Sequence, residues 1–397
     1  MNREEVRDEI LKLNSPNILC ELPTSFGKSK VALDLMSSRL DIEHMNPGVA
    51  RILIVVPRLV LIKNWKDEFV KWGYEKYLNY VEFVTYVSFP KKAGDWALVI
   101  FDEVHHLSER CRDALQDFNI VSSIMLSATV NNNMKGALTA VFPDLYIYKV
   151  STRQAINEEV LPDPKVYLIP LTLDNTRINH EIVKNKSQKI ELVIPYSKKF
   201  DYAKVKNRKI IIKCTQKQYY DDMSSIITWY KKNSFSKRLK NLFLKKSGDR
   251  LKWLSDQKSA YIKSLLDHIG NQRTLTFCNS IAQTEELGTY CVNSKNIKKS
   301  NKNLDMFNNE HIDHITACNM LDEGMNLVNC RVGVYAVLNS SERIIKQKLG
   351  RLLRHPDPII IIPYFKNTRE EEIVKQMLED YNPELVSTVT SLTDLKL

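Results

Sequence analysis

Short apolar runs alternate with amphipathic segments through the first 150 residues. Each run has the length and the boundary residues of a buried strand. Between them, residues 28–40 and 58–73 carry apolar side chains at helical spacing. Strands that alternate with helices predict a parallel sheet with right-handed crossovers. The predicted strands are 17–22, 51–57, 97–103 and 122–128.

The alternation stops after about residue 150 and resumes near residue 261. We therefore expect an α/β protein with two units, residues 1–150 and 261–397, on either side of a middle segment, 151–260. Beyond this loose duplication no internal repeat is visible. The second set of predicted strands is 274–279, 314–319, 331–337 and 358–364.

Length and composition agree with two folded units. The 397 residues exceed the roughly 250–300 that one core can organise, and 43% of them are apolar. The seven cysteines form no C-x-x-C pair, which argues against a disulfide framework and against a zinc site. No apolar run approaches the roughly 18 residues of a membrane span, and the charged N-terminus is not a signal peptide. We expect a soluble, cytoplasmic protein without a membrane partner, in a host cytoplasm if it is phage-encoded.

Positive charge is concentrated in the middle of the chain. The formal charge of the whole chain is +11. Residues 174–260 contain 18 Lys and 4 Arg against 6 Asp and 2 Glu, a net charge of +14, so the remainder is close to −3. A surplus on this scale indicates a polyanionic partner such as nucleic acid.

The stretch ELPTSFGKS, residues 21–29, is a candidate phosphate-binding loop between a predicted strand and a predicted helix. Leu22 stands where the common G-x-x-x-x-G-K-[ST] form has its first glycine. In such a loop, backbone N–H groups at the helix N-terminus face the phosphates of ATP. Lys28 supplies a charge, and the Ser29 hydroxyl is a ligand for Mg²⁺. Taken alone, GKS also fits an ordinary strand–turn–helix. The predicted ATP contacts are Pro23, Thr24, Ser25, Phe26, Gly27, Lys28 and Ser29.

Two carboxylates end the predicted strand 97–103, in ALVIFDEVHH. They would emerge at the carboxyl edge of a parallel sheet, where open α/β sheets bind ligands. Asp102 could hold the metal, and Glu103 could polarise the attacking water. The alternative is an acidic turn followed by a helix capped by His105 and His106.

With these residues the chain resembles the superfamily 2 helicases in their DExH form. Further stretches follow that family's motif order: 57–65 resembles motif Ia, 85–89 the T-Y-x-S element, 127–129 motif III, 276–280 motif IV, 321–327 motif V and 347–354 motif VI. The resemblance implies nucleic-acid contacts by Pro57, Arg58, Thr85, Tyr86, Asn279 and Ser280. It implies coupling roles for His105, Ser127 and Thr129, and ATP contacts by Glu323, Gly324 and Asn326.

Motif VI matches Q-x-x-G-R-x-x-R throughout. Arg351 and Arg354 lie three apart, so on a helix they share one face. Across a cleft from the phosphate loop they would act as arginine fingers, with Gln347 near the nucleotide or the water. The resemblance implies two RecA-like parallel-sheet domains of the P-loop NTPase class. ATP and Mg²⁺ lie between them, nucleic acid lies across their top, and hydrolysis drives movement along a strand.

The chain departs from the family pattern at three places. Ser25 replaces a glycine, so the loop backbone there must suit a serine. An adenine-reading glutamine is missing near the N-terminus, where a helix at 3–13 could place Arg3 or Arg7 on the base. Asn326 stands where aspartate is frequent. Nucleobase selectivity therefore stays open.

The middle segment begins with a hinge-like stretch, 152–164, and then matches no motif. It mixes lysines with aromatic residues, and 216–256 has a helical pattern. Two interpretations remain open: an accessory clamp that contacts phosphates and stacks on bases, or a helical insert with solvated lysines.

The motif set resembles DNA-acting members more than DEAD-box RNA helicases. The principal hypothesis is a monomeric, ATP-dependent DNA helicase or translocase without an identifiable protein partner. The alternatives are an RNA helicase and a nucleic-acid-binding protein that uses ATP only as a switch.

Overall fold

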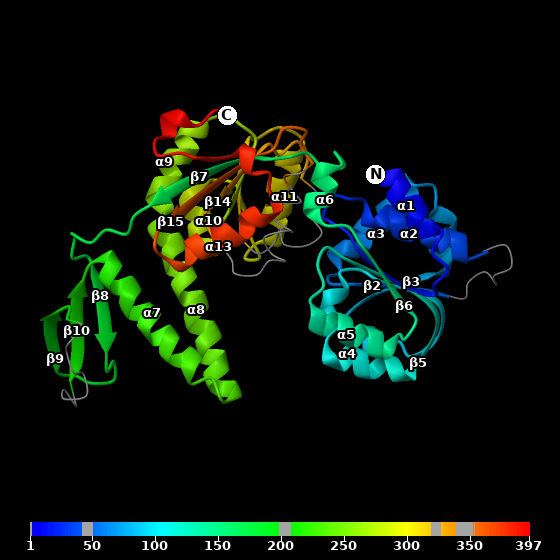
Figure 1. The fold of residues 1–397 in the computed structure, drawn as a ribbon, viewed down its shortest axis with the longest axis horizontal. Coiled ribbons are helices and arrows are strands. Elements are labelled where there is room, and N and C mark those ends of the chain that lie inside the picture. The colour runs from blue at the N-terminus through cyan, green and yellow to red at the C-terminus, as the bar shows by residue number, and fades with distance from the viewer. Residues whose placement is uncertain (1, 42–50, 198–207, 319–326, 339–351, 353) are drawn as a thin grey trace.

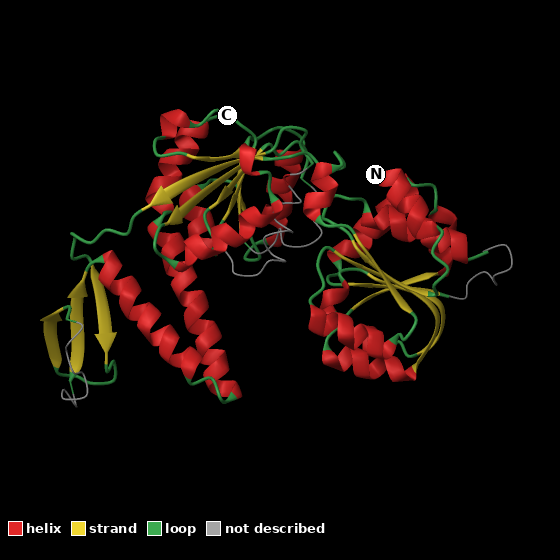
Figure 2. Cartoon of the chain, viewed as in Figure 1, coloured by secondary structure: helices red, strands yellow, loops and turns green. Residues whose placement is uncertain are grey.

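The computed structural model describes residues 2–41, 51–197, 208–318, 327–338, 352 and 354–397, and Figure 1 shows their arrangement. Two parallel sheets, each covered by helices, form two units, and a further sheet with two long helices extends from the second unit (Figure 2). Within the described ranges, no helix is long and apolar enough to cross a bilayer.

The first unit is a six-stranded parallel sheet in the order β3-β2-β4-β5-β1-β6. In Figure 1, α1, α2 and α3 lie on one face and α4 and α5 on the other. The strands are β1 (Asn17–Glu21), β2 (Ile52–Val56), β3 (Val81–Thr85), β4 (Gly94–Phe101), β5 (Phe118–Ser127) and β6 (Leu145–Lys149). The helices are α1 (Arg3–Leu11), α2 (Lys28–Arg39), α3 (Val60–Lys71), α4 (Glu109–Ala114) and α5 (Asn132–Val141).

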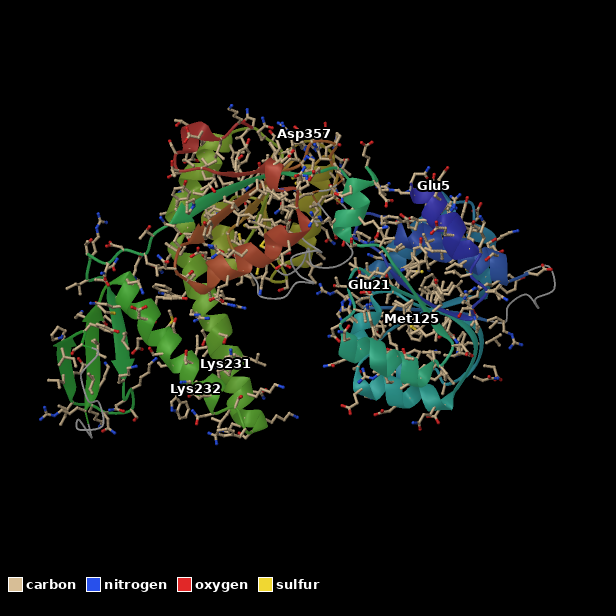
Figure 3. All side chains as sticks on the ribbon, viewed as in Figure 1. Glu5, Glu21, Met125, Lys231, Lys232 and Asp357 are labelled. Carbon is tan, nitrogen blue, oxygen red and sulfur yellow. The ribbon has the colours of Figure 1, made fainter. Side chains whose placement is uncertain are left out.

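Both faces of this sheet are buried, which explains the continuous apolar runs in the sequence. All five residues of β2 are buried. Ile52 and Ile54 pack in the core under α1, α2 and α3, whereas Leu53 and Val55 pack in the core on the opposite face. Met125 of β5 lies in that opposite core, and Figure 3 shows its place within the first unit. A strand with helices on both faces has no polar side, so the period of two disappears.

The second unit is a seven-stranded parallel sheet in the order β12-β13-β11-β14-β15-β7-β16. Its strands are β7 (Lys165–Leu171), β11 (Thr274–Phe277), β12 (Cys291–Val292), β13 (His314–Ala317), β14 (Val332–Tyr335), β15 (Ile359–Phe365) and β16 (Val386–Thr388). Its helices are α9 (Ser259–Ile269), α10 (Ile281–Leu287), α11 (Ile297–Asn308) and α13 (Arg369–Met377), and α6 (Thr152–Asn157) precedes β7.

One strand of the second sheet lies far from the others in sequence. β7 falls inside the predicted middle segment, yet it pairs along its whole length with β15. The second unit therefore begins near Lys165 rather than near residue 261, and residues 172–258 are an insertion after its first strand. The strand escaped prediction because Pro162, Pro164 and Pro170 make this stretch look like a linker.

The insertion contains more than the expected helix. It has a three-stranded sheet in the order β8-β10-β9 and two helices. The predicted helix over 216–256 is broken at 233–236, where the chain turns back on itself. The elements are β8 (His180–Lys184), β9 (Glu191–Pro195), β10 (Lys209–Cys214), α7 (Gln216–Lys232) and α8 (Lys237–Gln257).

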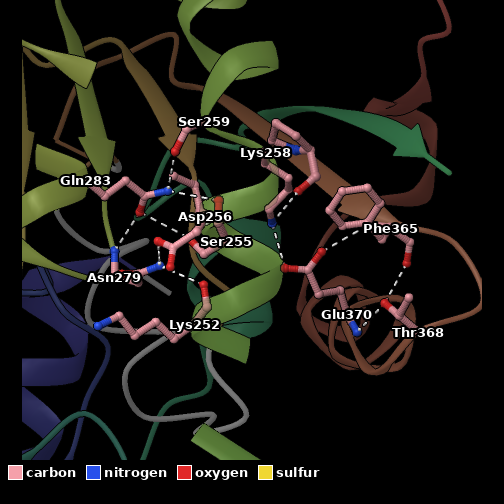
Figure 4. Close-up of polar contacts among 12 residues, drawn as sticks. Lys252, Ser255, Asp256, Lys258, Ser259, Asn279, Gln283, Phe365, Thr368 and Glu370 are labelled. Atoms are coloured by element: carbon pink, nitrogen blue, oxygen red, sulfur yellow. Dashed lines mark hydrogen bonds and ion pairs between the residues drawn. The ribbon is translucent and has the colours of Figure 1, made fainter. Parts of the chain in front are cut away.

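A buried ion pair ties the insertion to the second sheet. Lys258, between α8 and α9, and Glu370, at the start of α13, are both fully buried, and Lys258 Nζ lies 2.6 Å from Glu370 Oε1 (Figure 4). The ammonium also donates to the Pro363 carbonyl, and the other carboxylate oxygen accepts from the Phe365 N–H. Burial lowers the pKa of Lys258, and the Glu370 charge acts in the opposite direction. Each charge is therefore tolerated in the core because the other is present.

A second buried network holds the end of α8 against α10. Gln283 donates from its side-chain nitrogen to the Ser255 carbonyl, and Ser255 Oγ donates to the Ala336 carbonyl (Figure 4). Gln283 Oε1 accepts from the Asn279 N–H. With these contacts, the base of α8 is part of the second unit's core.

We predict that Lys258→Met lowers the free energy of unfolding of the second unit by about 3–5 kcal/mol, because Glu370 is left as an unpaired buried charge. Lys258→Met combined with Glu370→Gln should cost less than Lys258→Met alone, since the amide oxygen still accepts from Phe365. Denaturant titration measures both. Lys295→Met, at an exposed pair with Glu285, is the control and should change stability by only about 0.5 kcal/mol. Equal losses for the single and double variants would contradict the charge argument.

Candidate nucleotide site

Three loops meet at the carboxyl edge of the first sheet. β4, β5 and β1 are neighbours in the sheet and run parallel, so the segments that follow them emerge side by side. After β1 comes the stretch 22–27, after β4 come Asp102 and Glu103, and after β5 comes the stretch 128–131. The predicted phosphate loop, acidic pair and motif III are thus brought together by strand order alone.

The phosphate loop contains two residues with left-handed backbone. Ser25 has φ 69°, and Gly27, the N-cap residue of α2, has φ 103°. Glycine adopts this conformation freely, whereas serine carries strain of about 1 kcal/mol. The side chain of Lys28 folds back over the loop, and its Nζ donates to the Leu22 carbonyl at 3.3 Å. Ser29 follows in the first turn of α2, so its hydroxyl lies at the N-terminal end of the helix.

Asp102 is held from two sides by aromatic side chains. Trp65 Nε1 donates to Asp102 Oδ2 at 2.9 Å, and the Tyr86 hydroxyl donates to the Asp102 carbonyl at 2.8 Å. Burial raises the pKa of Asp102 to about 6, and the neighbouring Glu103 charge adds to the rise. The Trp65 hydrogen bond and the Lys28 charge lower it. The carboxylate is therefore oriented by hydrogen bonds and short of compensating positive charge.

Glu103 contacts both the phosphate loop and the third loop. Its φ is 50°, a left-handed value that turns the chain at the end of β4 into the short helix η4 (Val104–His106). Its Oε1 lies 4.0 Å from Lys28 Nζ, and its Oε2 lies 3.4 Å from both His105 Nδ1 and Ser127 Oγ. His105 Nδ1 is 3.0 Å from Ser127 Oγ, which can donate to the Thr129 carbonyl at 3.0 Å. The three sequence motifs of the first unit thus form one polar network.

The second unit reaches this network through an arginine. Arg354 Nε donates to Ser25 Oγ at 3.2 Å, across 329 residues of sequence. Leu352, two residues earlier, packs on Gly333 of β14, where a Cβ would lie 2.1 Å from a Leu352 methyl carbon. The glycine lets this segment approach the strand closely. The other predicted motif V and VI residues, Glu323, Gly324, Asn326, Gln347 and Arg351, lie outside the described residues.

The predicted nucleic-acid contacts are spread over several elements. Pro57 and Arg58 follow β2, and Thr85 ends β3. Tyr86 has a side chain that is only 6% exposed, and its hydroxyl donates to the Asp102 carbonyl, so its contact with nucleic acid stays a prediction. Asn279 donates to the Lys252 carbonyl and to Asp256, and Ser280 is the N-cap of α10.

The predicted base-stacking arginines both have protein partners. Arg3 donates to the Val160 carbonyl at 3.2 Å. Arg7 Nε lies 3.6 Å from Asp34, a buried carboxylate of α2 that also accepts from Tyr74. The stacking role stays a prediction.

Sequence reasoning missed two residues that shape the site. Trp65 ends the stretch that resembles motif Ia, and no local sequence signal indicates its hydrogen bond to Asp102. Gly333 lies within a predicted strand, where an isolated glycine does indicate a close backbone approach. The scarcity of glycine, with only 11 in the chain, makes that signal stronger.

Comparison with known proteins agrees with this architecture. No known family profile matches the chain. The chain is similar to the DNA 3'-5' translocase XPB2 of Sulfurisphaera tokodaii, 22% identical over 357 residues that cover 85% of this chain and 74% of that protein. Among solved structures it resembles S. cerevisiae Dbp5 bound to RNA and ADP BeF3, with TM-score 0.61, 10% identity, and coverage of 98% of this chain and 89% of that one. It also resembles a fragment of a putative HsdR subunit of a type I restriction enzyme from Vibrio vulnificus, with TM-score 0.58, 16% identity, and coverage of 98% and 68%. At these identities the solved structures establish the fold, two RecA-like units in tandem.

We predict that Ser25→Gly keeps nucleotide affinity, because glycine adopts φ 69° without strain, whereas Ser25→Val weakens it about tenfold. Valine is β-branched and suits the left-handed region poorly, so the loop must rearrange. Titration with a fluorescent ATP analogue and Mg²⁺ measures the difference. Ser25→Ala is the control, since it removes the hydroxyl that Arg354 contacts without adding a branch. Equal affinity for the alanine and valine variants would show that the backbone conformation is not what matters.

Proposed function

We propose that this chain, a superfamily 2 helicase or translocase with two RecA-like domains, couples ATP hydrolysis between those domains to movement on DNA. The main support for the proposal is the hydrogen bond from Arg354 to Ser25, because it brings an arginine of motif VI to the phosphate loop. An arginine in that place stabilises the charge that develops on the transferred phosphoryl group.

The residues present fit Mg²⁺. Ser29 and Asp102 would hold it, and the cation would neutralise charge on the β- and γ-phosphates. The Asp102 carboxylate is oriented by Trp65 Nε1 at the edge of the sheet where the phosphate loop also emerges, and a carboxylate with a serine hydroxyl is a donor set that suits a hard cation. Among the described residues no cluster of three or more His, Cys, Asp or Glu side chains could hold a metal by itself. This agrees with Mg²⁺, which usually takes one or two protein ligands together with phosphate oxygens and water.

Each remaining residue has a separate part in hydrolysis. Lys28 Nζ, which donates to the Leu22 carbonyl in this structure, would instead contact the phosphates when ATP binds. Glu103 would orient and polarise the attacking water, with its carboxylate held by Ser127 and near His105. Ser127 Oγ lies next to His105 Nδ1 and can donate to the Thr129 carbonyl. A movement of the Glu103 carboxylate would therefore be transmitted through these contacts to Thr129.

DNA is favoured over RNA as the partner. The matched curated relative is named a DNA translocase, whereas Dbp5, which is bound to RNA, shares only the fold. An RNA helicase is the second candidate. A protein that binds nucleic acid and uses ATP only as a switch is the third. An ATPase panel with single-stranded DNA, forked DNA, duplex DNA and duplex RNA separates the three.

We predict that DNA-stimulated ATP hydrolysis falls at least about 100-fold in Lys28→Ala and in Glu103→Gln, for different reasons. The first loses a phosphate contact and should bind ATP more weakly. The second keeps its size and should bind ATP while failing to activate water. Steady-state ATPase and nucleotide titration report the two effects. Lys12→Ala, at the exposed C-cap of α1, should behave as the unchanged protein. ATPase activity that is indifferent to every nucleic acid would overturn the motor proposal.

We predict that Arg354→Ala lowers kcat about 1,000-fold or more and leaves ATP binding within a few-fold, because a finger acts mainly in the transition state. Arg354→Lys should recover only part of the rate, since lysine lacks the planar fork of donors. Single-turnover hydrolysis measures this difference. A loss confined to ATP affinity would show that Arg354 binds the ground state instead.

A further inference from the structure

The α7–α8 arm, residues 216–257, is anchored only at its base. There, Tyr220 and Leu254 pack with Leu173 and Phe365 of the second unit. Beyond Ile227 of α7 and before Leu254 of α8, no described side chain of the arm is buried. Figures 1 and 2 show α7 starting beside the small sheet and α8 running into the second unit, with the two helices converging toward the tip, and α8 alone is about 30 Å long at 21 residues. The tip, residues 229–240, is therefore exposed on both helices.

Positive charge is unbroken along the outer half of the arm. Residues 223–248 contain no Asp or Glu. In the described part of the chain, no carboxylate lies within 4.0 Å of these cations except Asp249, at 3.9 Å from Lys246. Lys231 and Lys232 lie on the outer half of the arm in Figure 3. The seven cations of this stretch are Lys231, Lys232, Lys237, Arg238, Lys240, Lys245 and Lys246.

Three of these cations act against the stability of their own helix. Lys237, Arg238 and Lys240 occupy the first turn of α8, which contains no acidic residue. A helix N-terminus carries partial positive charge, so cations there are unfavourable and carboxylates are preferred. The three cations at the start of α8 therefore do not stabilise the helix, but they are well placed to bind an external anion.

An aromatic ring stands at the centre of this charge. Phe235 is 85% exposed, the largest exposed fraction among the large apolar side chains of the described residues. The turn closes without it: Asn233 donates to the Trp229 carbonyl, Ser234 donates to the Lys231 carbonyl, and Ser236 accepts from the Leu239 N–H. The ring is therefore held on an ordered turn and packs in no core of its own.

The neighbouring groove is a weaker candidate for an anion. Its volume is about 670 Å³, and it lies between the arm and α13 with the cations Lys231, Arg250, Arg369 and Lys375 in its lining. Arg369 and Lys375 pair with Glu372 and Glu371, and Arg250 donates to Ser224 Oγ. Lys231 belongs to the tip, where most of the other arm cations lie.

We propose that the tip of the α7–α8 arm binds DNA at a junction between duplex and single strand. Its cations contact phosphates, and Phe235 stacks on the base exposed at the junction. Lysines around an exposed ring suit this partner, because phosphates and a base lie within one nucleotide of each other. Of the two exposed rings at the tip, Phe235 is the more accessible, at 85% against 56% for Trp229. A membrane surface would require a broad apolar face. The inference rests on the proposed DNA function and assigns it a contact outside the helicase motifs.

We expect Phe235→Ala to weaken binding of a fluorescent forked DNA roughly 5- to 100-fold without nucleotide, the range of a lost base–aromatic stack. Phe235→Tyr should retain affinity, and Phe235→Leu should lose it, since only a ring can stack. ATPase at saturating DNA should stay unchanged. Tyr146→Ala, an exposed aromatic of β6, is the control. Full affinity in Phe235→Leu would overturn the stacking role, and so would an equal loss in the control.

The charge is tested by replacing Lys237, Arg238 and Lys240 with alanine together. The slope of log affinity against log salt should fall by about 2–3 in magnitude, at about 0.9 per phosphate contact. The Tm should stay the same or rise, because the helix N-terminus loses unfavourable cations. A lower Tm with an unchanged slope would make these residues structural and overturn the proposal. If the unchanged protein shows no DNA response in the ATPase panel, the proposed function fails, whereas binding lost only in the tip variants concerns the arm alone.

Discussion

The parallel register of β4, β5 and β1 is the constraint on which the nucleotide site depends. Parallel neighbours end at the same edge, so the loops after them meet whatever their separation in sequence. Glu103 lies 3.4 Å from Ser127 Oγ and 4.0 Å from Lys28 Nζ, and each of the three residues lies at the end of a different strand or just after it. A slip of one residue in any of these strands would turn every side chain to the other face and separate the three groups.

Two of the seven non-glycine residues with positive φ in the described part of the chain lie at the same edge. Ser25 and Glu103 both have positive φ, at 69° and 50°, and both lie where the chain leaves a strand. Each conformation costs folding free energy that only the surrounding packing can offset. At Glu103 the bend sends the following residues into η4, which sets His105 next to Ser127. At Ser25 it brings the hydroxyl to Arg354. At this edge, the two residues with left-handed backbone therefore join one loop to another and the first unit to the second.

Local pattern predicted β1, β2, β4 and β5 of the first unit, because helices on both faces make those strands continuous apolar runs. It did not predict β3 and β6, which lie at the two edges of the sheet and are only partly buried. The α/β class with two parallel sheets followed from the same pattern. What could not be predicted depends on contacts between distant segments. β7 pairs with β15 almost 200 residues later, and its prolines hide it. The Trp65 bond to Asp102 and the Lys258–Glu370 pair join residues whose sequence surroundings show nothing unusual. The split of the predicted long helix at 233–236 is signalled only by Asn233, Ser234 and Ser236, which are common at caps and turns.

The buried Lys258–Glu370 pair fixes the arm to the second unit. Because it joins the end of α8 to α13 beside β15, the arm has little freedom to move apart from the second sheet. Any rotation of the second unit toward the phosphate loop, where Arg354 already contacts Ser25, must carry the arm with it.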